Sequence, residues 1–197
     1  MASSRRQSQP PNGAPPGSAT SRRRVPRRAT ARHLENVALG YLARFQATAR
    51  SLERVLHRRV AASARHHGTD TDQGRALVAD LIARYLRAGL LDDAAFARAR
   101  AISLHGRGIS TRSIIARLAE KGVPRPEIDA ALAALAEEAP DDTPPDLAAA
   151  KRTARRRRLG PWRGEDVRAE RREKDLAALA RAGFSYSVAK SVIDGER

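Results

Sequence analysis

Apolar residues recur every three or four positions along most of this chain, starting near Arg32. The first such stretch carries the apolar set Leu34, Val37, Ala38, Tyr41, Leu42 and Phe45. This spacing places the apolar side chains on one face of a helix. The strict alternation of apolar and polar residues that marks a half-buried strand is found nowhere in the sequence. The pattern therefore predicts an all-α fold of about nine helices.

Residues that favour helix ends divide the pattern into segments. Thr48, Asp92 or Asp93, and Ser110 precede apolar-periodic stretches, as N-cap residues do. Gly89 and Gly122 follow such stretches, and a glycine commonly ends a helix. Pro124 and Pro126 stand where a sixth helix should open.

Other polar stretches predict connections. Residues 66–73 are polar and contain a glycine, so they predict a loop after the second helix, while residues 139–146 predict an acidic, proline-bearing linker. Thr143, Pro144 and Asp146 fit the cap, first-turn proline and capping-box acid of a seventh helix. That helix runs into the four arginines at 155–158, and the remaining two are predicted at about 165–181 and 185–193.

An internal repeat is visible in two segments. In one, Leu118 precedes Gly122 by four residues and Val123 follows, and in the other, Leu179 precedes Gly183 by four residues and Phe184 follows. A short apolar-periodic helix comes after each. Tandem three-helix units explain this spacing, because units too small to bury an apolar face alone stack on their neighbours. We expect units at 31–90, 91–139 and 140–197 (the last with its linker) in an elongated, curved monomer.

Composition favours binding to acidic polymers. The formal net charge is +16 and the isoelectric point is about 11.5, so phosphates and acidic protein surfaces are attracted. The sequence has no cysteine and no apolar run near the roughly 20 residues that a membrane helix needs, which predicts a cytoplasmic protein with no membrane partner. Residues 1–30 are rich in Pro, Gly, Ser and Arg and predict a disordered basic tail. That tail is either a passive leader or an arm that binds phosphate.

Ten basic residues are the candidates for contact with DNA or a DNA–protein filament. They form a run of arginines in the seventh helix and clusters on or near the second and fifth. The candidates are Arg54, Arg58, Arg107, Arg112, Arg117, Lys121, Arg155, Arg156, Arg157 and Arg158. For each one the alternative is ordinary solvated surface charge. Arg152, Arg163, Arg168, Arg171 and Arg172 are expected to reinforce the arginine run.

Signals for catalysis are weak. Asp92 and Asp93 could act as an acid–base pair, but helix capping explains them better. His66 and His67 have no further ligand cluster nearby in the sequence, which makes a metal site a poor interpretation. Trp162, beside Gly160-Pro161, fits a turn anchor better than a platform for a base. No phosphate-cradling glycine loop or nucleophile elbow is present, so we expect no cofactor, no metal and no enzymatic activity.

Four stretches together resemble one known family. They are ALGYLARF at 38–45, LRAGLLDDAAFARA at 86–99, RGISTRSIIARLAEKGV at 107–123, and ARRRRLGPWR at 154–163 with LARAGFSYSVAKSVI at 179–193. In this order and spacing they are similar to the RecX family of bacterial regulators of the RecA recombinase. The resemblance implies a non-catalytic modulator that binds in the groove of the filament of RecA and single-stranded DNA. It also implies inhibition of RecA's recombinase, ATPase and coprotease activities. The alternative is a helical protein that binds DNA or RNA non-specifically and has no RecA partner.

Overall fold

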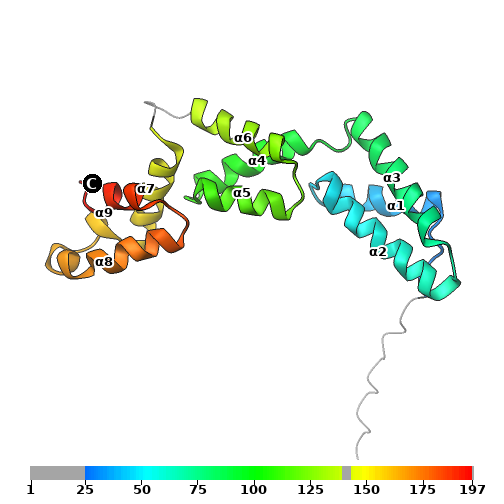
Figure 1. Cartoon of the computed structure of the whole chain (residues 1–197), viewed down its shortest axis with the longest axis horizontal. Coiled ribbons are helices and arrows are strands. Elements are labelled where there is room, and N and C mark those ends of the chain that lie inside the picture. The colour runs from blue at the N-terminus through cyan, green and yellow to red at the C-terminus, as the bar shows by residue number, and fades with distance from the viewer. Residues whose placement is uncertain (1–24, 139–142, 197) are drawn as a thin grey trace, which may run out of the picture.

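The computed structural model describes residues 25–138 and 143–196, and these residues form nine α-helices, a short 3-10 helix and no strand. The helices fall into three groups of three along an elongated, arched molecule (Figure 1). The prediction of an all-α fold of tandem three-helix units is therefore confirmed. The first group is α1 (Ala31–Leu42), α2 (Ala49–His67) and α3 (Thr71–Arg87). The second is α4 (Asp93–Gly106), α5 (Thr111–Glu120) and α6 (Arg125–Glu137). The third is α7 (Pro145–Arg157), the 3-10 helix η2 (Gly160–Trp162), α8 (Glu165–Arg181) and α9 (Tyr186–Ile193).

Local sequence sets the helix starts. The side chains of Thr48, Asp92 and Ser110 each accept a hydrogen bond from the backbone N–H three residues on, at the N-termini of α2, α4 and α5. These bonds satisfy donors that the first turn of a helix leaves open. The three predicted caps are confirmed. Pro124 occupies the N-cap position of α6, which also begins where it was predicted.

The buried apolar residues form three separate clusters, one in each group. Leucines dominate the first cluster, in which Leu34, Leu52 and Leu56 are fully buried. The second cluster is built around Ile114 and Leu118, and the third holds Leu179 and Phe184 of the repeated motif in its interior. The first cluster also contains Leu91, one residue beyond the predicted end of the first unit. The unit boundaries stay a prediction.

The connection between α2 and α3 is shorter than predicted. α2 continues through His67, and α3 begins at Thr71, so only residues 68–70 join them. Gly68 ends α2 with a φ of 63°, and the Asp70 side chain accepts from the N–H groups of Asp72 and Gln73. A left-handed glycine and an Asp cap together complete the turn within three residues. The prediction of a longer loop was wrong because the polar residues at 66–67 and 71–73 belong to the ends of the two helices.

Two further predictions need correction. The helical spacing puts Phe45 on the apolar face of the first helix, but α1 ends at Leu42 and the Phe45 side chain is 51% exposed, with its ring 5.1 Å from that of Tyr41. The start of α7 also differs, because its N-cap is Pro144 and no side chain caps it. The Asp146 carboxylate instead accepts from the N–H and the hydroxyl of Thr111, at 2.7 and 2.9 Å.

The predicted tail lies mostly outside the described residues, as do positions 139–142 of the predicted linker. The described residues 25–30 contact α2. The N–H of Ala29 donates to the Ser63 hydroxyl at 2.9 Å, and the carbonyl of Pro26 lies 2.6 Å from the His67 ring. This last part of the predicted tail is thus held against the first group.

The first and second groups meet through polar contacts that we name the first joint. The hydroxyls of Thr48 and Ser51 both donate to the carbonyl of Lys121, at 2.6 and 3.1 Å. The N–H of Ala49 donates to the Asp93 carboxylate at 2.9 Å. The N-terminus of α2 is therefore attached to the C-terminus of α5 and to the start of α4.

The second and third groups meet in the same manner, at what we name the second joint. The hydroxyls of Ser110 and Ser113 donate to the carbonyl of Ala182, at 2.9 and 3.2 Å. The N–H of Thr111 donates to the Asp146 carboxylate, the counterpart of the bond from Ala49 to Asp93. The second helices of the three groups thus lie end to end, with the N-terminus of α2 on the C-terminus of α5 and that of α5 on the C-terminus of α8 (Figure 1). This order aligns the helix dipoles favourably.

Glycine makes this close approach possible. Gly122 and Gly183 directly follow the two acceptor carbonyls and have φ values of 79° and 93°, a region that L side chains rarely adopt. A Cβ on Gly183 would lie 2.6 Å from the Ser110 hydroxyl oxygen, and one on Gly122 would meet the side chain of Arg50. The glycines of the repeat therefore both end a helix and admit the neighbouring group.

Candidate nucleic-acid interface

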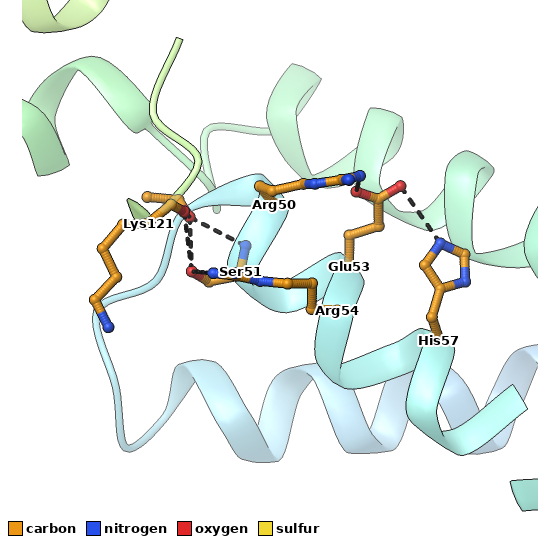
Figure 2. A network of polar contacts seen from close by, with 7 residues as sticks. Arg50, Ser51, Glu53, Arg54, His57 and Lys121 are labelled. Atoms are coloured by element: carbon orange, nitrogen blue, oxygen red, sulfur yellow. Dashed lines mark hydrogen bonds and ion pairs between the residues drawn. The ribbon is translucent and has the colours of Figure 1, made fainter. Parts of the chain in front are cut away.

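Four of the predicted cations surround the first joint. Arg54 and Arg58 lie one turn apart on α2, while Arg117 and Lys121 lie one turn apart at the end of α5. The Arg54 guanidinium contacts the Ser51 hydroxyl at 3.2 Å and the carbonyl of Glu120 at 3.4 Å. In Figure 2 the Lys121 carbonyl faces Ser51, while its aliphatic chain extends away from these contacts. The fold thus brings together two predicted pairs that lie far apart in the sequence.

The other six lie at or near the second joint. Arg156 on α7 donates to the carbonyl of Arg107 at 2.6 Å, which ties the arginine run to the end of α4. Arg155 and Arg157 are exposed on the same helix, and Arg158 ends it in the left-handed conformation, with φ 54°. Arg112 is exposed on the first turn of α5.

All ten predicted cations are exposed, and none of them belongs to an ion pair within the described residues. Arg54 and Arg156 bond to uncharged groups, which leave their positive charge uncompensated. Elsewhere on the surface, arginines do pair, as in Arg125–Asp129 and Arg84–Glu35. The candidate surface therefore directs its charge outward.

Two arginines expected to reinforce this surface are engaged inside the third group instead. Arg163 forms two hydrogen bonds to the buried Asp175 carboxylate, which also accepts from the N–H of Gly160. Arg168 donates to the carbonyls of Ile193 and Gly195. Their contacts stabilise the packing of α8 on its neighbours, so they add less to the outer surface than the sequence suggested.

The pKa of Asp175 reflects this arrangement. Burial on its own would raise the pKa of this carboxyl. The hydrogen bonds from Arg163 and the Gly160 N–H, together with the nearby positive charges, outweigh burial and hold the pKa below its usual value. Arg172, a third arginine expected to reinforce the surface, forms a comparable pair with Asp194 and lowers the pKa of that carboxyl. Both carboxylates are structural partners of arginine.

The paired aspartates at the start of α4 have separate structural tasks. Asp92 caps α4 by accepting from the N–H of Ala95 at 2.8 Å. Asp93 accepts from Ala49 across the first joint, and burial raises its pKa. Capping explains Asp92 as predicted, whereas no local pattern indicates the role of Asp93.

The histidine pair and the tryptophan are also accounted for. His66 and His67 close α2, and the described residues contain no group of three potential metal-ligating side chains. Trp162 packs, half-buried, on the third apolar cluster, as expected of a turn anchor.

Sequence reasoning missed the joint residues, although a signal was present. Thr48-Ala-Arg-Ser51 and Ser110-Thr-Arg-Ser113 share a hydroxyl at the first and fourth positions and an arginine at the third. The first hydroxyl of each four-residue segment is predicted by its position to be a helix cap. The same oxygens also reach a carbonyl more than seventy residues away.

The arrangement can bind phosphates or acidic side chains, because guanidinium and ammonium groups donate charge-assisted hydrogen bonds to both. None of the described helices is long and apolar enough to cross a bilayer. Fold and surface together define a helical-repeat protein with exposed, unpaired cations at or near both joints of its described residues.

Comparison with known proteins identifies the family. Residues 92–132 match the family model described as RecX, second three-helix domain. The chain is 45% identical to Regulatory protein RecX of Myxococcus xanthus over 86% of this chain and 88% of that protein. It is 36% identical to Regulatory protein RecX of Streptomyces coelicolor over 58% of this chain and 57% of that one. No solved structure matches the chain. The protein belongs to the RecX family of regulatory proteins.

Proposed function

We propose that this protein regulates the RecA recombinase by binding the filament that RecA forms on single-stranded DNA. In this role it lowers the recombinase, ATPase and coprotease activities of RecA. The observation that carries the proposal is the set of ten exposed cations that have no ion-pair partner in the described residues. The relatives are named Regulatory protein RecX, and this name supports a regulatory role.

The distribution of these cations suits a filament better than a small molecule. They lie at or near both joints, on or at the ends of α2, α5 and α7 and directly after α4, so the surface extends over all three groups. A linear polymer offers repeated phosphates and repeated protein surfaces to such an array, and each contact releases counterions. The protein is proposed to act in this way as a monomer in the cytoplasm, without a cofactor.

A second candidate is a DNA- or RNA-binding protein with no protein partner. The same unpaired cations favour it, because phosphate contacts alone account for non-specific binding. It differs from the first in two measurable respects. Binding would be equally strong without RecA, and affinity would fall steeply with salt whether RecA is present or not.

The deciding experiment is the DNA-dependent ATPase of RecA, followed as this protein is added to preformed filaments. We expect inhibition at a molar ratio well below one protein per RecA protomer, together with shorter filaments in electron micrographs. Saturating amounts that change neither the rate nor the filament length would contradict the proposal. Equal binding to bare single-stranded DNA would then favour the second candidate.

The same assay tests the basic tail. A deletion of residues 1–24 keeps the contacts of Pro26 and Ala29 with α2, so the first group remains intact. A weaker variant would assign the tail a phosphate-binding role. An equally potent variant would identify the tail as a passive leader.

A further inference from the structure

A groove crosses the first joint on the side of α1 and α4. One depression of about 370 Å³ is lined by Leu42, Phe45, Gln46, Ala47, Leu90, Asp92, Ala95, Phe96 and Ala99. A second, of about 330 Å³, is lined by Gln46, Phe96, Ala99, Arg100, Ser103 and Lys121. Because the two depressions share three lining residues, they form one groove, which we name the joint groove.

The joint groove concentrates apolar surface that the fold leaves open. Phe45 is 51% exposed and Leu90 is 54% exposed, and the half-buried Phe96 lies between them and the second depression. Single exposed apolar residues are common on soluble proteins. Exposed apolar side chains gathered in one concave site are a mark of interaction surfaces. Two of the three phenylalanines of the sequence line this groove.

The edge of the groove is basic. Arg100 and Lys121 line its second half, and the Arg44 guanidinium lies 5.6 Å from the centre of the Phe45 ring. Asp92 is the acidic residue among the lining, and its carboxylate accepts a hydrogen bond from the N–H of Ala95 as the N-cap of α4. The groove therefore combines an apolar floor with a cationic edge.

We propose that the joint groove binds an acidic protein segment with an apolar face, which inserts its apolar side chains between Phe45, Leu90 and Phe96. The inference rests on the proposed function, in which that segment belongs to a RecA protomer of the filament. Aliphatic leucine and alanine side chains line most of the first depression, and aromatic anchors set among aliphatic groups are typical of protein-binding hot spots. Charge complementarity selects the acidic partner, since Arg100 and Lys121 remain unpaired in the described part of the chain.

The groove also depends on the arrangement of the groups. Its lining comes from the first group through Leu42 and Phe45, and from the second through Phe96, Arg100 and Lys121. The carbonyl of the same Lys121 accepts the hydroxyls of Thr48 and Ser51. The first joint therefore holds the two walls of the groove next to each other.

The test uses Phe45→Ala and Leu90→Asp in the full chain. Both side chains are about half exposed, so we expect each variant to keep its helix content and thermal midpoint. The concentration that halves the ATPase of preformed RecA filaments should rise about tenfold or more, as for loss of a hot spot. The affinity for bare single-stranded DNA should stay within about twofold, because none of the ten candidate cations is altered.

Ile102→Asp is the matched control. Ile102 lies on α4, is 45% exposed and lines a different depression, so it receives the same charge on the second group outside the joint groove. It should retain the potency of the wild type. Inhibition by Phe45→Ala and Leu90→Asp equal to that of the wild type would overturn the groove proposal and leave the proposed function standing.

Other outcomes also decide the matter. A loss of DNA affinity in both variants would overturn a protein occupant and identify a site for bases. A wild-type dimer that Leu90→Asp converts to monomer, seen by light scattering, would show that a second copy covers the groove and would overturn the RecA segment as its occupant. A wild type without effect on RecA would overturn the proposed function and this inference together.

Discussion

The hydroxyl of Thr48 donates a 2.6 Å hydrogen bond to the carbonyl of Lys121, a residue 73 positions away in another helical group. Ser110 forms the equivalent bond to Ala182 across 72 positions. In each case the donor also caps the N-terminus of its own helix. One side chain therefore both starts a helix and joins two groups. The joints, the cores beside them and the cations around them can each be tested by substitution.

Removal of one hydroxyl at each joint, in Thr48→Val with Ser110→Ala, should loosen the arrangement of the groups and leave each core folded. Every hydrogen bond removed costs about 1 kcal/mol, and every cap removed costs about as much again. We expect a broader distance distribution and a larger radius of gyration in small-angle X-ray scattering. Ser185→Ala is the control, because the Ser185 hydroxyl caps α9 inside the third group. An unchanged scattering curve in the double variant would show that these two hydroxyls do not hold the groups in place.

Gly183→Ala should destabilise the second joint more than its backbone conformation alone explains. A left-handed alanine costs about 1–2 kcal/mol, and the new Cβ would also lie within 3 Å of the hydroxyl oxygens of Ser110 and Ser113. Gly89→Ala is the matched control, since Gly89 has a φ of 69° and open space around its Cβ position. The difference between the two decreases in thermal stability isolates the contribution of the joint. Equal decreases would argue against close packing at Gly183.

Arg163→Ala should unfold the third group more readily. The Asp175 side chain is only 3% exposed, and loss of its arginine leaves a buried charge without an ion-pair partner, at a cost of about 3 kcal/mol. The single tryptophan, Trp162, lies in this group, so its fluorescence in urea reports the local transition. Arg172→Ala removes a more exposed pair and should destabilise the third group far less.

The pH dependence of the third group follows from the same pair. The folded pKa of Asp175 lies below its unfolded value, so its ionisation stabilises the fold above the unfolded pKa, about 3.9. This contribution is lost as the pH falls through the depressed folded value. Asp175→Asn should therefore be less stable than the wild type at pH 7, and the difference should shrink below about pH 4. A constant difference from pH 7 to pH 2 would contradict the assignment.

Tyr85→Phe should stabilise the first group. The Tyr85 hydroxyl is buried without a hydrogen-bond partner in the described residues, and burial raises its pKa. An unsatisfied buried polar group costs about 1 kcal/mol or more, so its removal should slow amide hydrogen exchange in α2 and α3. The half-buried Tyr41 provides the control in Tyr41→Phe, which should change exchange little. Faster exchange in Tyr85→Phe would mean that the hydroxyl is satisfied in solution.

Arg117→Gln with Lys121→Gln should weaken binding to single-stranded DNA. The slope of log affinity against log salt should also fall by about one for each phosphate that the protein no longer neutralises. Arg125→Gln is the control for net charge, because Arg125 is exposed on the same group but paired with Asp129. We expect it to affect the slope far less. A change in slope per charge removed that is equal in the two variants would indicate that only total charge matters.

Local patterns in the sequence predicted the helices well and their contacts poorly. Ser110 and Thr48 were identifiable as caps because a cap depends on residues within one turn. Asp146 shows that a local pattern does not predict a contact between groups. By position it fits a capping-box acid, yet its carboxylate accepts hydrogen bonds from Thr111 in the preceding group. Phe45 shows a second limit of local patterns, because helical spacing continues through it although α1 ends three residues earlier. The candidate cations were visible as clusters, but only the fold reveals that Arg54 and Lys121 share a joint.

The three separate apolar clusters have a consequence for release from a long polymer. No apolar core of the described residues spans a joint. If the protein binds a filament as proposed, one group could therefore detach while the other two stay bound, and the tethered group would rebind at a high effective concentration. Spontaneous dissociation of the whole protein would require all three groups to be detached at the same time and would therefore be slow. A competitor that occupies each vacated site prevents its return and removes the protein one group at a time. We therefore expect the residence time of the protein on a filament to be long when no other protein competes for the same sites and short when competitors are present.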